Sequence, residues 1–180
     1  GVSDHTACYF DSKGLDVQAM AAYASRTGAL KGFSTQGEFD PRQLLIQRCD
    51  ILVPAAVERV IDAEVAKGLQ CRVLAEAANG PTTPDADRVL DMRRDEIFVI
   101  PDILCNAGGV IVSYFEWVQG IQQFFWDRSE VLSRLQSVLD NAFGRVMARV
   151  DRERIPHRTA AMAIGVERVM QAKHVRGLFP

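Results

Sequence analysis

The chain has no long apolar run and no excess of one charge, and each absence excludes a class of function. No stretch approaches the roughly 18 consecutive apolar residues of a membrane span, and the first residues lack the charged and apolar regions of a signal peptide. We therefore expect a cytoplasmic protein with no membrane partner. The formal net charge is −2 with both signs interspersed, which offers no basic surface, so we expect no nucleic-acid partner.

Cysteine and histidine are also sparse. The four cysteines lie far apart and form no CxxC pair, so we predict neither a disulfide framework nor a metal site. We expect reduced thiols that mostly pack, with only Cys105 close to a functional site. The three histidines are scattered along the chain and are given no catalytic role: His5, His157 and His174.

What the chain does contain is an alternation of short apolar runs and helical segments. A length of 180 residues, 48% of them apolar, is enough for one domain with a proper core. Strands are expected at 50–53, 71–75 and 97–100 with helical connections between them, which indicates an α/β fold with a parallel sheet. Beyond Trp126 the strands stop, and amphipathic helices are expected at 129–152 and 158–173. We therefore divide the chain into an α/β part, 1–126, and carboxyl-terminal helices, 127–180, packed on it.

Two asparagine-glycine turns stand out in this pattern. The strand ending at Ala75 runs into Asn79-Gly80, and Thr83 is predicted to cap the helix that follows, with Pro84 as its first residue. The strand ending at Ile100 leads to Asn106 and then to a glycine pair, which would let a flat ligand approach the backbone. Because ligands of parallel sheets bind at the carboxyl ends of the strands, both asparagines are candidates for a binding site. The alternative is that both turns merely link a strand to a helix.

The segment after the second turn has helical periodicity. Its apolar residues are predicted to form one buried face, with Ser113 and Glu116 lying off that stripe. The stripe consists of Val110, Tyr114, Trp117, Val118, Ile121 and Phe125.

Several of these segments closely resemble the Glu/Leu/Phe/Val dehydrogenase family, and within it the carboxyl-terminal half of glutamate dehydrogenases. The segments are CDILVPAA from Cys49, ANGPTTP from Ala78, IPDILCNAGGVIVSYFEWVQ from Ile100 and RTAAMAIGVERVMQAKHVRGLFP from Arg158. The resemblance implies a Rossmann-like parallel sheet, NAD or NADP as cofactor, and L-glutamate and 2-oxoglutarate as substrates. It also implies a homo-oligomer, a hexamer in the full-length family.

The resemblance assigns roles to individual residues. Asn79 and Asn106 would contact the ribose and carboxamide of the cofactor, because an amide both donates and accepts hydrogen bonds. The adenosine half would lie beside Ala55 and Ala56, and its ribose hydroxyls would meet the carboxylate of Asp4, which ends the motif VSD. The substrate side chain would contact Val110 and Ser113. No catalytic residue is assigned, because the family's catalytic lysines and aspartate belong to an amino-terminal substrate domain.

The GxGxxG turn that holds the pyrophosphate in dinucleotide-binding folds is not found in this chain. We therefore expect the sequence to start partway through the nucleotide-binding domain, without its first β-α unit. The chain is interpreted as the cofactor-binding part of a glutamate dehydrogenase that is inactive alone, with NAD favoured because Asp4 would repel a 2′-phosphate. The alternative is a non-catalytic module, derived from a dehydrogenase and kept for assembly or regulation, with a vestigial nucleotide site.

Overall fold

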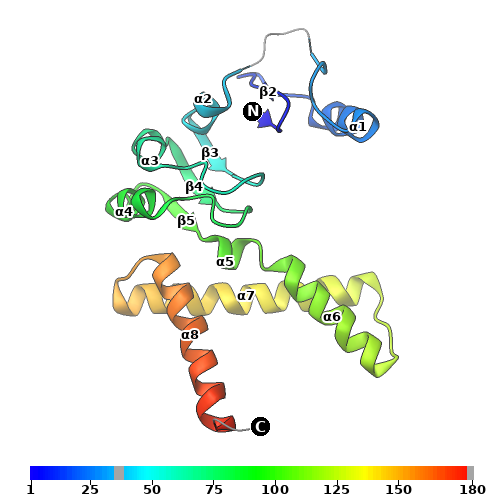
Figure 1. The fold of residues 1–180 in the computed structure, drawn as a ribbon, viewed down its shortest axis with the longest axis vertical. Coiled ribbons are helices and arrows are strands. Elements are labelled where there is room, and N and C mark those ends of the chain that lie inside the picture. The colour runs from blue at the N-terminus through cyan, green and yellow to red at the C-terminus, as the bar shows by residue number, and fades with distance from the viewer. Residues whose placement is uncertain (35–38, 178–180) are drawn as a thin grey trace.

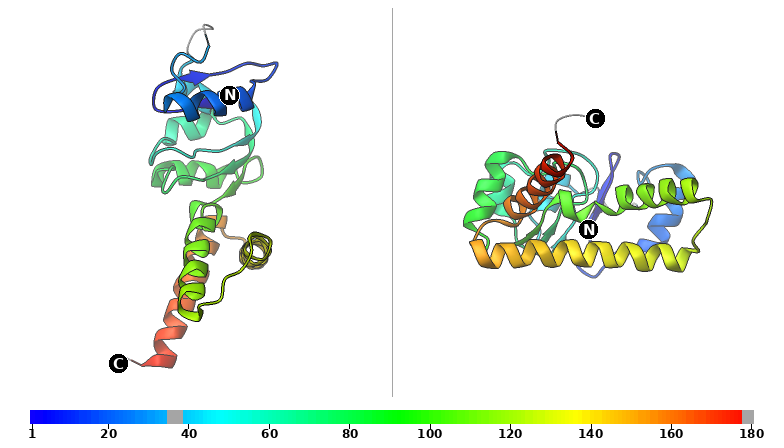
Figure 2. Two further views of the ribbon diagram at one scale, coloured as in Figure 1. Left: turned by 90° about the vertical axis from the view of Figure 1, so that its right-hand side faces the viewer. Right: turned by 90° about the horizontal axis from the view of Figure 1, so that it is seen from below.

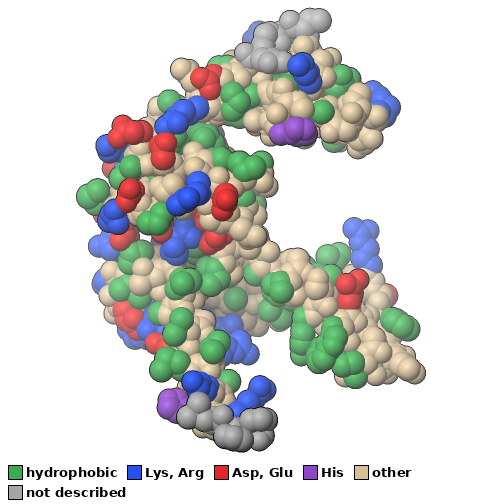
Figure 3. Space-filling model, in the orientation of Figure 1, with side chains coloured by type: hydrophobic (Ala, Val, Ile, Leu, Met, Phe, Trp, Pro, Cys, Tyr) green, Lys and Arg blue, Asp and Glu red, His purple; other side chains and the backbone are tan. Residues whose placement is uncertain are grey.

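The computed structural model describes residues 1–34 and 39–177. Figure 1 shows the elements following one another down the long axis. A small amino-terminal unit of two strands and a helix comes first, then a central sheet, and then a group of carboxyl-terminal helices. The space-filling view in Figure 3 shows that one side of the molecule is hollowed between the amino-terminal unit and the carboxyl-terminal helices. Within the described residues, no helix has the length and apolar character needed to cross a bilayer.

The central sheet confirms the predicted parallel α/β arrangement. Its strand order is β3-β4-β5, and both strand pairs are parallel. The strands span Cys49–Leu52, Cys71–Ala75 and Phe98–Ile100. They are connected by α3, Ala63–Gly68, and α4, Pro84–Met92, which contact each other. The largest apolar core lies between these helices and the sheet, with Ile61, Leu69 and Leu74 fully buried.

The amino-terminal residues form a separate small unit. Strands β1, Val2–Ser3, and β2, Cys8–Tyr9, pair antiparallel with each other and not with the central sheet. A second core packs Tyr9 and Met20 beneath helix α1, Val17–Thr27, which ends at Gly28 with φ of 80°. Most of α1 is exposed, because the two short strands cover only the face that carries Met20. A short helix α2, Pro41–Leu45, capped by Asp40, leads into β3.

The carboxyl-terminal half is helical, as predicted. Helix α5, Asp102–Cys105, follows β5 directly, and α6, Gly108–Gln122, begins two residues after Asn106. The longest helix is α7, Arg128–Glu153, and Figure 2 shows α6 and the last helix α8, His157–Arg176, on the same side of it. A third core joins α7 to α8 through Val146 and Ala160. Helix α8 also contacts α5 and β5, so it lies against the end of the central sheet.

The prediction for the buried face of α6 is wrong. Val110, Tyr114 and Trp117 are all more than half exposed, whereas Phe115 and Gln119 are buried. The physical reason lies in the turn to α7, where the Trp126 ring packs edge-on against Phe115. The Oε1 of Gln119 accepts a hydrogen bond of 2.7 Å from the Trp126 backbone N–H. These contacts orient α6 so that its most apolar stripe faces outward.

Candidate functional site

The structure brings the two predicted asparagines into direct contact. The Nδ2 of Asn106 donates a hydrogen bond of 2.7 Å to the Oδ1 of Asn79. Asn79 precedes Gly80, whose φ of +54° places the turn in the left-handed region that glycine adopts without steric cost. Asn106 is the C-cap of α5, and its backbone N–H donates to the carbonyl of Asp102. The second asparagine therefore ends a short helix and does not follow its strand directly.

An open depression of about 800 Å³ lies over this pair. Its wall combines small side chains with the two amides, which leaves room for a flat ligand and supplies both donors and acceptors. Four predicted site residues meet here. Ala56 follows β3, Asn79 follows β4, Asn106 ends α5 and Val110 belongs to the first turn of α6. The full lining is Ala56, Glu58, Ala77, Ala78, Asn79, Asn106 and Val110.

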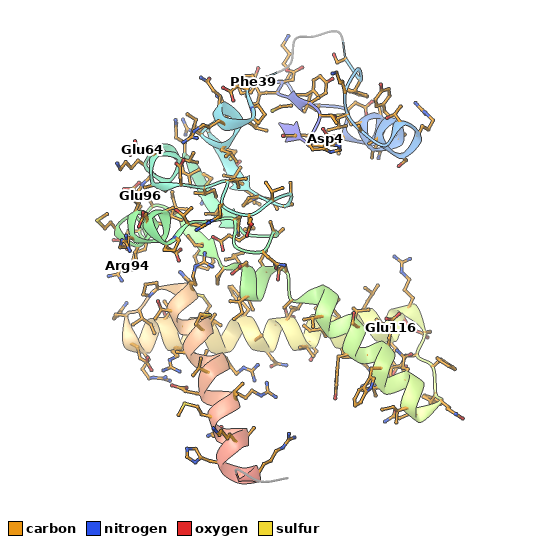
Figure 4. All side chains as sticks on the ribbon, viewed as in Figure 1. Asp4, Phe39, Glu64, Arg94, Glu96 and Glu116 are labelled. Carbon is orange, nitrogen blue, oxygen red and sulfur yellow. The ribbon has the colours of Figure 1, made fainter. Side chains whose placement is uncertain are left out.

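Three predicted site residues lie outside the lining of the depression. Ala55 is exposed beside Ala56, after the end of β3. Ser113 is exposed one helical turn beyond Val110, and its hydroxyl makes no hydrogen bond within the described part of the chain, so it is available to a ligand. Asp4 lies in the amino-terminal unit, and Figure 4 places it across the hollow from Glu116 of α6.

The Asp4 carboxylate is held by the loop around it. Its Oδ1 accepts hydrogen bonds from the backbone N–H groups of Thr6 and Ala7 and from the Thr6 hydroxyl, and its Oδ2 accepts one from the Leu30 N–H. Burial alone would raise the pKa of Asp4, but these hydrogen bonds outweigh it and hold the pKa far below its usual range. The carboxylate is therefore charged at neutral pH and fixed in direction.

The thiol next to the asparagine pair belongs to Cys105. Burial, reinforced by the charges of Glu76 and Asp102, raises the pKa of Cys105 above its ordinary value. The thiol therefore stays protonated at neutral pH. Among residues 1–34 and 39–177, no group of three His, Cys, Asp or Glu side chains could hold a metal ion.

A second cavity, of about 490 Å³, lies where α4 and β5 meet the turn between α7 and α8. His157 lies in its wall and packs edge-on against the ring of Phe98, 4.5 Å between centroids. Its Nε2 is buried without a hydrogen-bond partner among the described residues, and burial lowers its pKa. His157 therefore packs against Phe98, and burial favours its neutral form.

Sequence reasoning missed a set of charged residues behind the asparagine turns. Glu76 has a fully buried side chain, and Arg158 of α8 donates from Nη2 to both of its carboxylate oxygens at 2.6 Å. Asp102, at the start of α5, accepts from the Gly80 N–H at 2.8 Å and from Arg158 Nη1 at 2.9 Å. One local signal was present, because an acidic residue directly after the apolar strand 71–75 requires a buried partner. The partner lies 82 residues away and carries no local signal.

A parallel sheet with amide-bearing turns at the carboxyl ends of its strands is the layout of a dinucleotide-binding fold. Comparison with known proteins defines the class more closely. The family model described as Glutamate/Leucine/Phenylalanine/Valine dehydrogenase matches residues 1–177, and the chain belongs to this family.

The similar proteins are glutamate dehydrogenases. Glutamate dehydrogenase A2 of Halobacterium salinarum is 46% identical over 181 aligned residues, covering 99% of this chain and 43% of the relative. The NADP-specific glutamate dehydrogenase A1 of the same organism is 41% identical with the same coverage. Among solved structures, the hetero-hexameric glutamate dehydrogenase of Thermus thermophilus in its leucine-bound form superimposes with a TM-score of 0.87 at 30% identity. That match covers 98% of this chain and 41% of the other. The chain thus spans about two fifths of the length of these relatives.

Proposed function

We propose that this chain is the cofactor-binding part of an NAD(P)-dependent glutamate dehydrogenase, which oxidises L-glutamate to 2-oxoglutarate and ammonia. The observation that carries the proposal is the Asn79–Asn106 hydrogen bond at the base of the depression. Two amides joined in this way each keep free donors or acceptors, which suits the ribose hydroxyls and the carboxamide of a nicotinamide nucleotide.

The remaining site residues fit around this centre. Ala55 and Ala56 have side chains small enough to let the adenosine half lie against the backbone after β3. Val110 and Ser113 lie one turn apart on α6, so both can face a substrate bound next to the nicotinamide. A serine hydroxyl donates well to a γ-carboxylate, which favours glutamate over an apolar amino acid.

The choice of cofactor rests on Asp4. Its charged carboxylate disfavours the 2′-phosphate of NADP by repulsion, so we favour NAD as the cofactor. NADP is the alternative, because one of the similar proteins is NADP-specific. We also propose that the full-length protein is an oligomer, in keeping with the hexameric assembly named for the similar structure.

The test is titration of the isotope-labelled chain with NADH, followed through the side-chain amide resonances of both asparagines. We expect these resonances to shift, with weak affinity because a GxGxxG turn is not present to hold the pyrophosphate. Asn106→Ala should weaken binding by about tenfold, the loss of one hydrogen bond of roughly 1.4 kcal/mol. Asn141→Ala, on the remote surface of α7, is the matched control and should leave binding unchanged.

A different outcome supports the second candidate function. If NADH shifts neither asparagine resonance while the chain still joins the amino-terminal part of a relative in a stable complex, the chain is a module for assembly with a vestigial nucleotide site. The exposed apolar stripe of α6 is the observation that favours this alternative, because such a surface is suited to a protein partner.

A further inference from the structure

Four charged side chains lie directly behind the asparagine pair, and we call them the arginine cluster: Glu76, Asp87, Asp102 and Arg158. They come from four parts of the chain, since Glu76 follows β4, Asp87 lies on α4, Asp102 begins α5 and Arg158 lies on the first turn of α8. Glu76 is fully buried, and the side chain of Arg158 is 23% exposed.

Arg158 is the only cation in the arginine cluster and contacts all three acids. Its Nη2 binds Glu76, its Nη1 binds Asp102, and its Nε lies 2.6 Å from Asp87 as an ion pair without an aligned hydrogen bond. Burial would lower the pKa of Arg158, but Glu76 and Asp87 outweigh it and raise the pKa, so the guanidinium is always charged. A planar guanidinium with several fixed donors can bridge carboxylates in this way, whereas a lysine cannot.

The arginine cluster is connected to the site through Asp102. The second oxygen of Asp102 accepts the backbone N–H of Gly80, which fixes the turn that carries Asn79. The carbonyl of Asp102 accepts the backbone N–H of Asn106, which fixes the other asparagine. Glu76 completes the connection, because its Oε2 accepts the Asp102 N–H at 3.0 Å and its Oε1 accepts the Thr82 hydroxyl at 2.6 Å.

We propose that Arg158, on the carboxyl-terminal helix, is a positioning residue that holds the two asparagine turns in the geometry that binds the cofactor. The inference rests on the proposed function for its ligand, but the geometry stands by itself. Arg158 touches neither asparagine and acts through Asp102, on which both turns converge. Without it, the three carboxylates of the arginine cluster have no cation between them, and the Asp102 side chain loses the partner that directs it toward Gly80.

The test compares amide hydrogen exchange in variants of the chain. In Arg158→Met, we expect the N–H groups of Gly80 and Asp102 to lose at least tenfold in protection relative to the rest of the sheet, and the NADH dissociation constant to rise by about tenfold. Arg158→Lys should fold and show a smaller loss of the same kind. The matched control is Arg149→Met, because Arg149 also bridges two acids, Glu153 and Glu167, across α7 and α8. Arg149→Met should lower the melting temperature without changing the exchange protection of Gly80 and Asp102 or the NADH dissociation constant.

A double variant separates positioning from charge balance. In Glu76→Gln with Arg158→Met, the uncompensated buried charge is gone, so we expect the melting temperature to recover while the protection of Gly80 and the NADH affinity stay low. If the protection of Gly80 and the NADH affinity recovered together with the melting temperature, the proposal would be overturned, because Arg158 would then only neutralise Glu76. Unchanged exchange at Gly80 and Asp102 in Arg158→Met would also overturn it. Failure of the unaltered chain to bind NADH counts against the proposed function alone, since exchange is measured without ligand.

Discussion

Ser113 carries the proposed choice between glutamate and an apolar amino acid. Its hydroxyl is exposed and unengaged within the described residues, so a γ-carboxylate can accept from it without competition from the helix backbone. In a full-length enzyme carrying these residues, we expect Ser113→Ala to lower kcat/KM for glutamate about 10- to 100-fold, from the loss of a charge-assisted hydrogen bond of roughly 1.5–3 kcal/mol.

Norvaline is the discriminating substrate for this prediction. It has no γ-carboxylate, so its kcat/KM should hold or rise in Ser113→Ala. Ser133→Ala, an exposed helical serine on α7, serves as the control and should change neither value. Equal losses for glutamate and norvaline would mean that Ser113 supports the helix and does not contact the substrate.

Asp4 predicts a dependence of stability on pH. Its pKa is lowered in the folded chain, so its contribution to stability is fully present above the unfolded value near 4 and is lost as the pH falls toward the folded value. We expect Asp4→Asn to reduce the free energy of unfolding on the order of 2 kcal/mol at pH 7, and the difference from the unaltered chain to narrow below about pH 4. Urea unfolding between pH 3 and pH 7 measures this, with the exposed Asp95→Asn as the control. If the difference in free energy of unfolding between Asp4→Asn and the unaltered chain did not depend on pH, the lowered pKa assigned to Asp4 would be contradicted.

At the scale of single elements, the helix ends were the most predictable features. Thr83 caps α4 as predicted, because a capping side chain reaches only two or three residues along the chain. Asp40 caps α2 in the same way, and Gly28 ends α1. Strand β4 has the predicted bounds for a similar reason, since an apolar run between a glycine turn and an asparagine turn can extend no further.

Other features could not be read from one segment. The periodicity of α6 shows that one face is apolar, but the contact of Phe115 with Trp126 decides which face is buried. That Asn79 and Asn106 lie at one site could be expected from the rule for parallel sheets. Their hydrogen bond to each other and the contacts of Arg158 behind them could not. A buried ion pair depends on residues that only the tertiary fold brings together.

The cap of α4 provides a test at this scale. The Thr83 Oγ1 accepts the Ala86 N–H, so Thr83→Ala should reduce the free energy of unfolding by about 1 kcal/mol. Thr83→Ser keeps the hydroxyl and should retain most of that stability. The measurement is urea unfolding of both variants, and equal stability of the two would show that the hydroxyl does not cap the helix.

For the whole molecule, the feature that bears on catalysis is that the depression is open on one side. The lysines of this chain, Lys13, Lys31, Lys67 and Lys173, all lie outside the lining of the depression, and the chain covers about two fifths of the length of its relatives. The proposed function therefore draws its catalytic lysines from another part of the full-length protein.

We predict that the 180-residue chain alone produces no NADH from glutamate and NAD, and that addition of the amino-terminal part of a relative is needed for turnover. Absorbance at the NADH band measures the rate, and a sample carrying Asn106→Ala reveals any contaminating host enzyme. Turnover by the purified chain that disappears in Asn106→Ala would refute the prediction, because the chain would then hold a complete active site.

The distance in sequence between Glu76 and Arg158 sets an order of events during synthesis. At roughly 5–20 residues per second, the ribosome adds the 82 residues that follow Glu76, up to and including Arg158, in about 4 to 16 seconds. During that interval Asn79 and Asn106 are both added to the nascent chain, while the carboxylate of Glu76 stays in water or pairs with another group. The proposed cofactor site is therefore among the last parts of the chain to mature. A polypeptide released before α8 is made carries both asparagines without the Arg158 guanidinium that we propose aligns them.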